Sequence, residues 1–106
     1  MQADNSGMTP WQEGGLYSTP NEDGTYAVLK ILKLDPEGVH LRLYAQALAE
    51  RPTDVQIETL DLGIGHLPIA RSSFATWDLQ YLKTVPVQAE ELEGYQLWQE
   101  AGGGYF

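Results

Sequence analysis

The feature that most restricts the fold is a turn sequence, DPEG at residues 35–38, which separates two apolar segments. Proline presets φ at the second position of such a turn, aspartate can bond the backbone ahead of it, and glycine suits the last position. Residues 25–34 (TYAVLKILKL) precede the turn, and residues 39–44 (VHLRLY) follow it with strict alternation of apolar and polar side chains. The pattern predicts a β-hairpin.

Two registers fit this hairpin. If Gly38 forms a bulge, Lys33 lies opposite Leu41, whereas a two-residue loop puts Lys33 opposite His40. Residues 25–34 are apolar on both faces of the expected strand. We therefore expect that strand to be central in its sheet and covered on both sides.

The segments after the hairpin give weaker patterns. Residues 45–51 have helical propensity but end at Pro52, which indicates either a continued strand or a single helical turn. Residues 53–60 (TDVQIETL) alternate and predict a strand, as do residues 79–85 (LQYLKTV). Between them, the glycines and proline of residues 61–68 (DLGIGHLP) predict a loop.

Residues 87–101 change to a helical period. One helical face carries an apolar or aromatic residue at every third position, namely Leu92, Tyr95, Trp98 and Ala101. Acidic residues near the start suit the helix dipole, and the glycines at 102–104 predict the C-terminal end. The expected fold class is therefore α+β: a bent antiparallel sheet or small open β-barrel with one C-terminal helix.

The chain of 106 residues fits one domain. Residues 1–15 are polar and contain a proline and a glycine pair, so we expect a flexible N-terminal arm there. Residues 16–106 then form the single α+β domain.

Composition excludes several function classes. Fifteen acidic against six basic residues give a net charge of −9, which argues against nucleic acid and against anionic membranes as partners. The same charge favours solubility and suits a protein partner with a basic surface. With no cysteine, disulfides and zinc–thiolate sites are excluded. The N-terminal residues lack the features of a secretory signal, so a cytoplasmic location is expected, and no cofactor is expected.

One candidate binding surface lies on the second hairpin strand, where His40, Arg42 and Tyr44 share a face. Exposed, they would form a polar and aromatic patch able to recognise an anionic or amide-bearing partner. Alternatively this is an ordinary outward face, or Arg42 and Tyr44 lie over the C-terminal helix and bond its acids.

The second candidate is His66, within the glycine-rich sequence GIGHLP at residues 63–68. It either presents an imidazole at the mouth of a pocket or belongs to a tight connection in which it bonds a backbone carbonyl. The sequence contains no GxGxxG, HxH or HExxH pattern and no nucleophile elbow. We therefore predict no catalytic residues and no metal ligands.

Several stretches read together resemble a group of small bacterial proteins of unknown function. They are GTYAVLKIL at 24–32, VHLRLY at 39–44, RPTDV at 51–55, GHLP at 65–68 and EELEGYQLWQEAGGG at 90–104. The start of the domain, GLY at 15–17 followed by a turn and a GTYAV strand, is also similar to β-barrel immunity proteins that neutralise bacterial toxins. That second resemblance implies a toxin as partner and transfers no site residue.

We therefore expect a non-catalytic protein-binding module, with an immunity-like role against a basic toxin as its sharper form. The alternative is a small enzyme or ligand-binding domain whose pocket lies near His66 and the face of residues 40–44. Self-association as a homodimer, through a sheet edge or the aromatic residues at 105–106, would be compatible with either.

Overall fold

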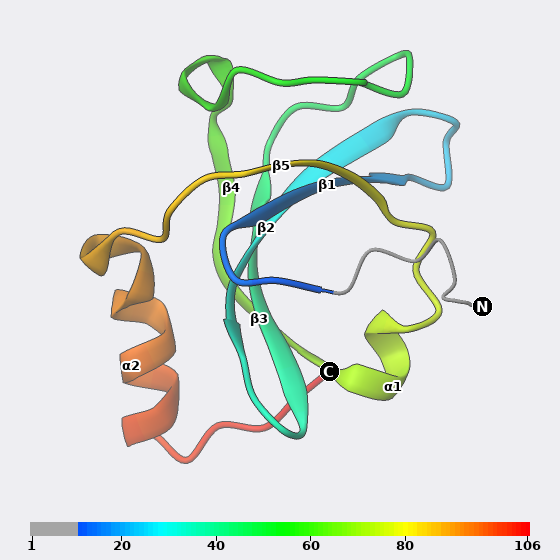
Figure 1. Ribbon diagram of the computed structural model, residues 1–106. Helices are drawn as coiled ribbons and strands as arrows, with labels where there is room; N and C mark the ends of the chain where they lie inside the picture. Colours follow the sequence, from blue (N-terminus) through cyan, green and yellow to red (C-terminus); the bar gives the residue numbers. More distant parts are fainter. Residues whose placement is uncertain (1–10) are drawn as a thin grey trace, which may run out of the picture.

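A computed structural model of the chain describes residues 11–106, which are built on one five-stranded antiparallel sheet (Figure 1). The strands lie in the order β4-β3-β2-β1-β5. Their bounds are β1 (Gly15–Pro20), β2 (Tyr26–Leu34), β3 (Gly38–Tyr44), β4 (Leu62–Ala70) and β5 (Gln80–Thr84). The helical elements are η1 (Ile57–Thr59), α1 (Arg71–Phe74), η2 (Ala89–Leu92) and α2 (Glu93–Glu100).

The expected α+β class is confirmed, and the sheet is open. Within residues 11–106, β4 and β5 form its two edges and do not pair with each other, so it does not close into a barrel. In Figure 1 the sheet is strongly twisted, with β1 and β5 running across the view while β3 and β4 run down it. Such twist follows from the right-handed preference of each strand.

The hairpin of β2 and β3 has the register of the two-residue loop. Lys33 lies opposite His40 and Leu34 opposite Val39, and the turn closes with a hydrogen bond from the Asp35 N–H to the Gly38 carbonyl. The irregularity falls within β2, between Ile31 and Lys33, rather than at the glycine. As expected, β2 is the central strand, because β1 and β3 flank it.

Two predicted segments are wrong. Residues 53–60, expected as a strand, contain the short helix η1, because Val55 and Ile57 pack under the sheet and no strand within residues 11–106 pairs with them. Residues 61–68, expected as a loop, form most of β4. A Cβ atom on Gly63 would approach the Leu43 carbonyl to 3.1 Å, so that glycine permits close strand packing rather than a turn.

Two other predictions agree with the structure more closely. The strand expected at 79–85 is present as β5. The helix expected at 87–101 begins as the 3₁₀ turn η2 and continues as α2, with a capping box between Gln88 and Glu91. It ends at Gly102, whose φ of +66° lies in the left-handed region that glycine adopts without strain. The segment 45–51 is irregular apart from a bridge between Leu48 and Tyr26.

The sheet has a buried layer on each face. One layer surrounds α1, and its buried members are Tyr17, Leu29, Ile31, Val39, Leu41, Ile69 and Phe74. The other contains a buried apolar group under the connection between β3 and β4, made of Leu16, Val28, Tyr44 and Val55. α2 lies over this second face beside that group, since its Tyr95 and Trp98 pack against His40 of β3.

Of the arm expected at residues 1–15, residues 1–10 lie outside the described residues. Trp11 packs against Phe74 with ring centroids 4.9 Å apart, and the Gly14 N–H donates to the Ile31 carbonyl at 2.7 Å. Residues 11–15 are therefore in contact with the domain. No helix within residues 11–106 is both long and apolar enough to cross a membrane.

Candidate functional site

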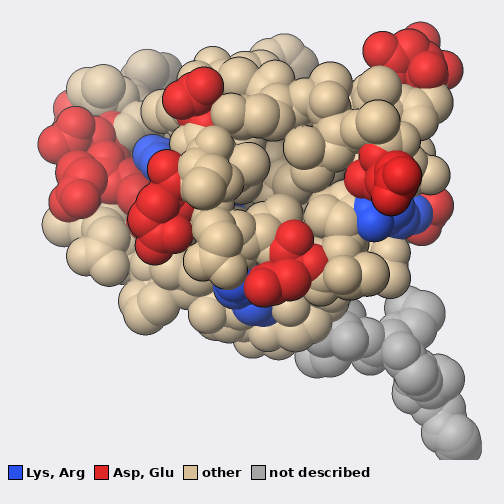
Figure 2. All heavy atoms as spheres, turned by 90° about the horizontal axis from the view of Figure 1, so that it is seen from above, with Lys and Arg blue, Asp and Glu red and all other residues tan. Residues whose placement is uncertain are grey.

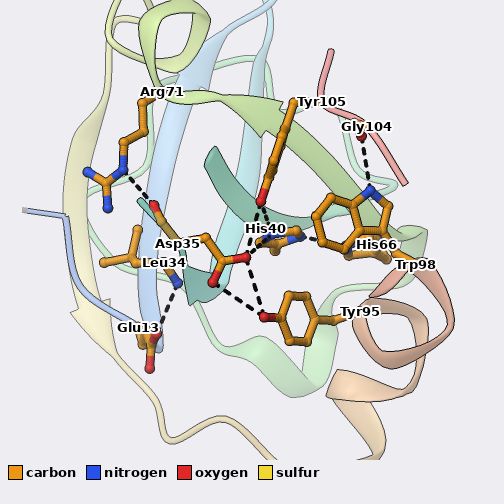
Figure 3. Close-up of polar contacts among 10 residues, drawn as sticks. All are labelled: Glu13, Leu34, Asp35, His40, His66, Arg71, Tyr95, Trp98, Gly104 and Tyr105. Carbon is orange, nitrogen blue, oxygen red and sulfur yellow. Dashed lines mark hydrogen bonds and ion pairs between the residues drawn. The ribbon is translucent and has the colours of Figure 1, made fainter. Parts of the chain in front are cut away.

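A hydrogen-bonded pair of histidines lies between the sheet and α2 (Figure 3). His40 of β3 is fully buried, and its Nδ1 lies 2.9 Å from Nε2 of His66 on the adjacent strand β4. Its other nitrogen, Nε2, lies 2.9 Å from Oδ2 of Asp35 and 2.9 Å from the hydroxyl of Tyr105. These are the only two histidines of the chain, and the fold brings them together across 26 residues.

Asp35 connects the hairpin turn to the C-terminal part of the chain. Its carboxylate accepts hydrogen bonds from the hydroxyl of Tyr105 at 3.1 Å and from that of Tyr95 at 3.3 Å. Its backbone carbonyl accepts from Nε of Arg71 at 2.7 Å. A turn residue thereby fixes the position of His40 relative to α2 and to residues 103–106, the C-terminal tail.

The carboxylate sets the direction of the proton chain. Because ionised Asp35 can only accept, Nε2 of His40 carries the proton that it donates to the carboxylate. Nδ1 of His40 is then an acceptor, and His66 donates to it through Nε2. This leaves Nδ1 of His66 without a proton, and this atom has no hydrogen-bond partner within residues 11–106. The chain Asp35–His40–His66 thus ends at a basic nitrogen.

Burial keeps both imidazoles neutral near pH 7. Desolvation lowers the pKa of His40, against the opposing effect of Asp35, and Lys33 lowers it further. Burial also lowers the pKa of His66, and the neighbouring His40 adds to that effect. Burial and the Asp35 carboxylate raise the pKa of Tyr105 to about 12, so its hydroxyl remains a donor.

Three aromatic rings enclose His40. The ring centroids of Tyr95, Trp98 and Tyr105 lie 4.5, 4.5 and 5.2 Å from that of His40, each in an edge-on arrangement. Nε1 of Trp98 donates to the Gly104 carbonyl at 2.9 Å, which holds the tail against α2 (Figure 3). The arrangement buries His40 beneath α2 and the tail and leaves His66 half-buried.

Two close approaches explain glycines around this cluster. A Cβ atom on Gly38 would collide with the ring of Tyr105, and one on Gly94 would lie 2.7 Å from Cβ of His66. Neither position can carry a side chain unless Tyr105 or His66 moves. Gly94 therefore marks close packing of α2 against β4.

A buried ion network lies next to the histidines on the same face. Nζ of Lys30, 1% exposed, is 2.9 Å from Oε1 of Glu91 and donates to the Pro86 carbonyl at 3.0 Å. Nη1 of Arg42 lies 3.4 Å from the other carboxylate oxygen. Burial alone would raise the pKa of Glu91, but the Gln88 backbone N–H and Lys30 together lower it. Glu91 therefore remains charged and balances two cations.

The structure places each predicted site residue on this one face. His40, Arg42 and Tyr44 do share a side of β3, and that side is covered rather than exposed. Arg42 reaches Glu91, as in the alternative where it bonds an acid of the C-terminal helical segment. The Tyr44 hydroxyl and Nε of Arg42 are buried and have no partner within residues 11–106. His66 lies beside His40, and its nearest partner is that side chain rather than a backbone carbonyl.

Sequence reasoning missed Asp35 as a functional residue, together with the tyrosines that bond it. Asp35 was explained fully as a turn residue, and its partners lie 60 and 70 residues further along the chain. Lys30 did carry a signal, since a lysine in the middle of a central apolar strand requires a buried partner. The identity of that partner could not be read from the sequence.

We call the residues around the histidine pair the histidine cluster: Asp35, His40, His66, Tyr95, Trp98 and Tyr105. A surface groove of about 430 Å³ lies elsewhere, and no residue of the histidine cluster lines it. Its lining residues are Thr19, Pro20, Asn21, Ala27, Leu43, Thr76, Trp77 and Asp78. Within residues 11–106, no group of three or more His, Cys, Asp or Glu side chains is arranged to hold a metal ion. The chemistry open to the histidine cluster is proton transfer through His66.

Comparison of the chain with known protein families, with curated proteins and with solved structures gave no match.

Proposed function

We propose that this protein is a non-catalytic binding module whose partner is a protein with a basic surface. The observation that carries the proposal is that nearly all basic side chains contact other groups of the same chain. Lys30 and Arg42 contact Glu91 in the interior, Arg51 pairs with Asp78, and Lys83 pairs with Asp54.

Arg71 is also occupied, because it donates to the Asp35 carbonyl and lies over the ring of Trp11. Five of the six basic residues therefore make contacts within the chain, while most acids are exposed. Figure 2 shows the result from above: acidic atoms are spread over several parts of this face, and each basic patch lies against acidic atoms. The net outward field is negative, which attracts and orients a basic partner.

The closed state of the histidine cluster supports the same proposal. A binding module needs no open pocket, and the aromatic rings around His40 are engaged in holding α2 and the tail. An immunity-like role, in which the chain covers a basic toxin, is the sharper form of the proposal.

The test has two stages. The intact chain, immobilised at low salt, is used to capture proteins from its native cells, and each captured protein is then purified and its binding measured directly. We expect a basic partner whose affinity falls steeply as salt rises, because surface charges are screened. A triple variant with Glu90→Gln, Glu93→Gln and Glu100→Gln, which spares Glu91, should bind more weakly. An acidic partner, or binding independent of salt, would contradict the proposal.

A second function is favoured by one observation, the free Nδ1 of His66 at the end of the Asp35–His40–His66 chain. This nitrogen could act as a base or nucleophile on a small acyl substrate. Hydrolysis of p-nitrophenyl acetate tests the idea. A small enzyme should lose about tenfold or more of its rate in His66→Gln, and equal rates in the two proteins would reject it.

A further inference from the structure

The two edges of the sheet are protected to different degrees. β5 is short, and its Lys83 is held by Asp54 at 2.7 Å. β4 has nine residues, and its first half, LGIG at residues 62–65, contains no charge and no proline. Natural sheets usually block an edge with such residues, because an open edge offers its backbone groups to another strand. The first half of β4 lacks that protection.

The second half of the same edge already holds a strand-like segment. The Phe106 N–H donates to the Pro68 carbonyl at 3.0 Å, and the Phe106 carbonyl accepts from the Ala70 N–H at 2.8 Å. Phe106 thus bonds Pro68 and Ala70, the residues on either side of Ile69. This is the hydrogen-bond pattern of a single parallel β-bridge between Phe106 and Ile69. The β4 edge is thus shaped to accept an added strand, and the tail occupies only its end.

Exposed apolar side chains gather on this side of the molecule. Within residues 11–106, four of the five large apolar residues that are exposed lie on β4 or on segments that contact it: Leu62 (51%), Ile64 (44%), Leu97 (67%) and Phe106 (73%). α2 contacts β4 where Gly94 meets His66, and Leu97 follows one turn later on that side of the helix. Exposed apolar residues gathered in this way are typical of a binding surface.

The charge of the same region selects the partner. Exposed acids flank the edge, with Glu58 and Asp61 before β4 and Glu93 beside its contact with α2. Residues 52–70 and 84–106, which contain β4, η1, η2, α2 and the tail, include no lysine or arginine. His66 adds no positive charge near pH 7, because burial lowers its pKa. A second copy of this chain would bring the same acids against these.

We propose that the open half of the β4 edge, residues 62–66, binds an extended segment of a basic partner protein as an added β-strand. The proposal rests on the proposed binding function and assigns it a surface. Backbone hydrogen bonds to β4 hold the segment, its apolar side chains cover Leu62 and Ile64, and its basic side chains face the flanking acids.

The probe is a labelled eight-residue peptide of alternating lysine and valine. Its control has the same sequence with alternate backbone amides N-methylated, which keeps the charge and removes hydrogen-bond donors. We expect the methylated peptide to bind at least about tenfold more weakly. NMR shift changes in the bound chain should centre on the backbone amides of residues 62–66.

Two variants separate the edge from general charge. Ile64→Lys blocks the β4 edge, and Gln80→Lys adds the same charge on the opposite edge strand; both replace exposed residues, and thermal unfolding checks that both fold. We expect Ile64→Lys to weaken peptide binding by about tenfold or more, and Gln80→Lys to weaken it by less than about twofold.

The outcomes distinguish this proposal from the function on which it rests. Equal effects of the two variants, or equal binding of the methylated peptide, would overturn the edge site and leave an acidic binding surface. Salt-dependent binding of a folded basic protein such as lysozyme, without binding of the peptide, would do the same. Binding of neither probe would overturn both proposals. A dimer that Ile64→Lys abolishes would show that a second copy occupies the edge, and would overturn the basic segment as occupant.

Discussion

One face of the sheet is filled by aliphatic side chains around Phe74, whereas the opposite face buries Lys30, Glu91 and His40 beneath α2 and the tail. On the first face the free energy comes from removing apolar surface from water, which depends on volume and fit. On the second face each polar group needs a particular partner, because an unpaired buried charge is costly. Substitutions therefore test packing on one face and pairing on the other.

The largest effect is expected from Phe74→Ala on the apolar face. Phe74 is fully buried, and the rings of Trp11 and Trp77 pack against it at 4.9 and 5.0 Å. The cavity should lower the free energy of unfolding by about 3–5 kcal/mol, as measured in urea. Ser73→Ala, at an exposed position of the same short helix, should change it by less than about 0.5 kcal/mol. A loss below about 1 kcal/mol in Phe74→Ala would show that this layer does not dominate stability.

On the polar face, Glu91→Gln should cost about 3 kcal/mol or more, because it leaves the buried cation of Lys30 without its counter-charge. Lys30→Met should cost less, since Glu91 keeps Arg42 at 3.4 Å. Glu93→Gln makes the same chemical change at an exposed position and should be nearly neutral. Urea unfolding of all three gives the order, and a larger loss in Lys30→Met than in Glu91→Gln would contradict the assigned roles.

The two faces also differ in how much could be predicted from the sequence. Strict alternation in residues 39–44 correctly placed His40, Arg42 and Tyr44 on one side of a strand, because the period of two is a local property. Whether that side is exposed to solvent depends on Glu91, Tyr95 and the tail, which begin about 50 residues further along the chain. Alternation alone cannot reveal what covers a face.

The wrong assignments have the same origin. The glycines in residues 61–68 indicate a loop, whereas in the structure Gly63 permits close approach to β3. Residues 53–60 alternate like a strand, yet none of the strands within residues 11–106 pairs with them. The helix at the C-terminal end was predictable, because its period, its acidic first turn and its terminal glycines are all local features.

Mild acid should weaken the fold through the two histidines of the polar face. The pKa values of His40 and His66 are lowered, so near pH 6 the unfolded chain binds more protons than the folded one. Their contribution to stability is present above about pH 6.5 and is lost as the pH falls, by at most about 1.4 kcal/mol per pH unit for each histidine.

Urea unfolding between pH 8 and pH 5 measures this loss. Asp35 and Lys33 are the charged groups that act on His40, and the tyrosines around it stay neutral in this range. In His66→Gln the amide can still donate to His40, and the decline with acid should be shallower. Stability that is constant or rises between pH 7 and pH 5.5 would contradict the assigned protonation states.

The smallest effect is expected from Tyr105→Phe. This substitution separates the ring packing of Tyr105 from the hydrogen bond of its hydroxyl. The ring still packs over Gly38 and beside Trp98, while the hydroxyl that donates to Asp35 is lost. The cost should be about 1 kcal/mol at pH 7. The pKa of Tyr105, about 12, also predicts how stability changes with pH. Because the folded state favours the neutral phenol, the contribution of Tyr105 to stability is present below pH 10 and is lost as the pH rises toward 12.

Tyr105→Phe should therefore decline less than the parent chain between pH 10 and pH 12. If Tyr105→Phe matches the parent in both stability and alkaline decline, the hydroxyl contributes nothing to the tail. The tail would then be held by its ring contacts and by the hydrogen bonds of Phe106 to β4. The hydrogen bond between the Tyr105 hydroxyl and Asp35 would then add nothing to the stability of the polar face.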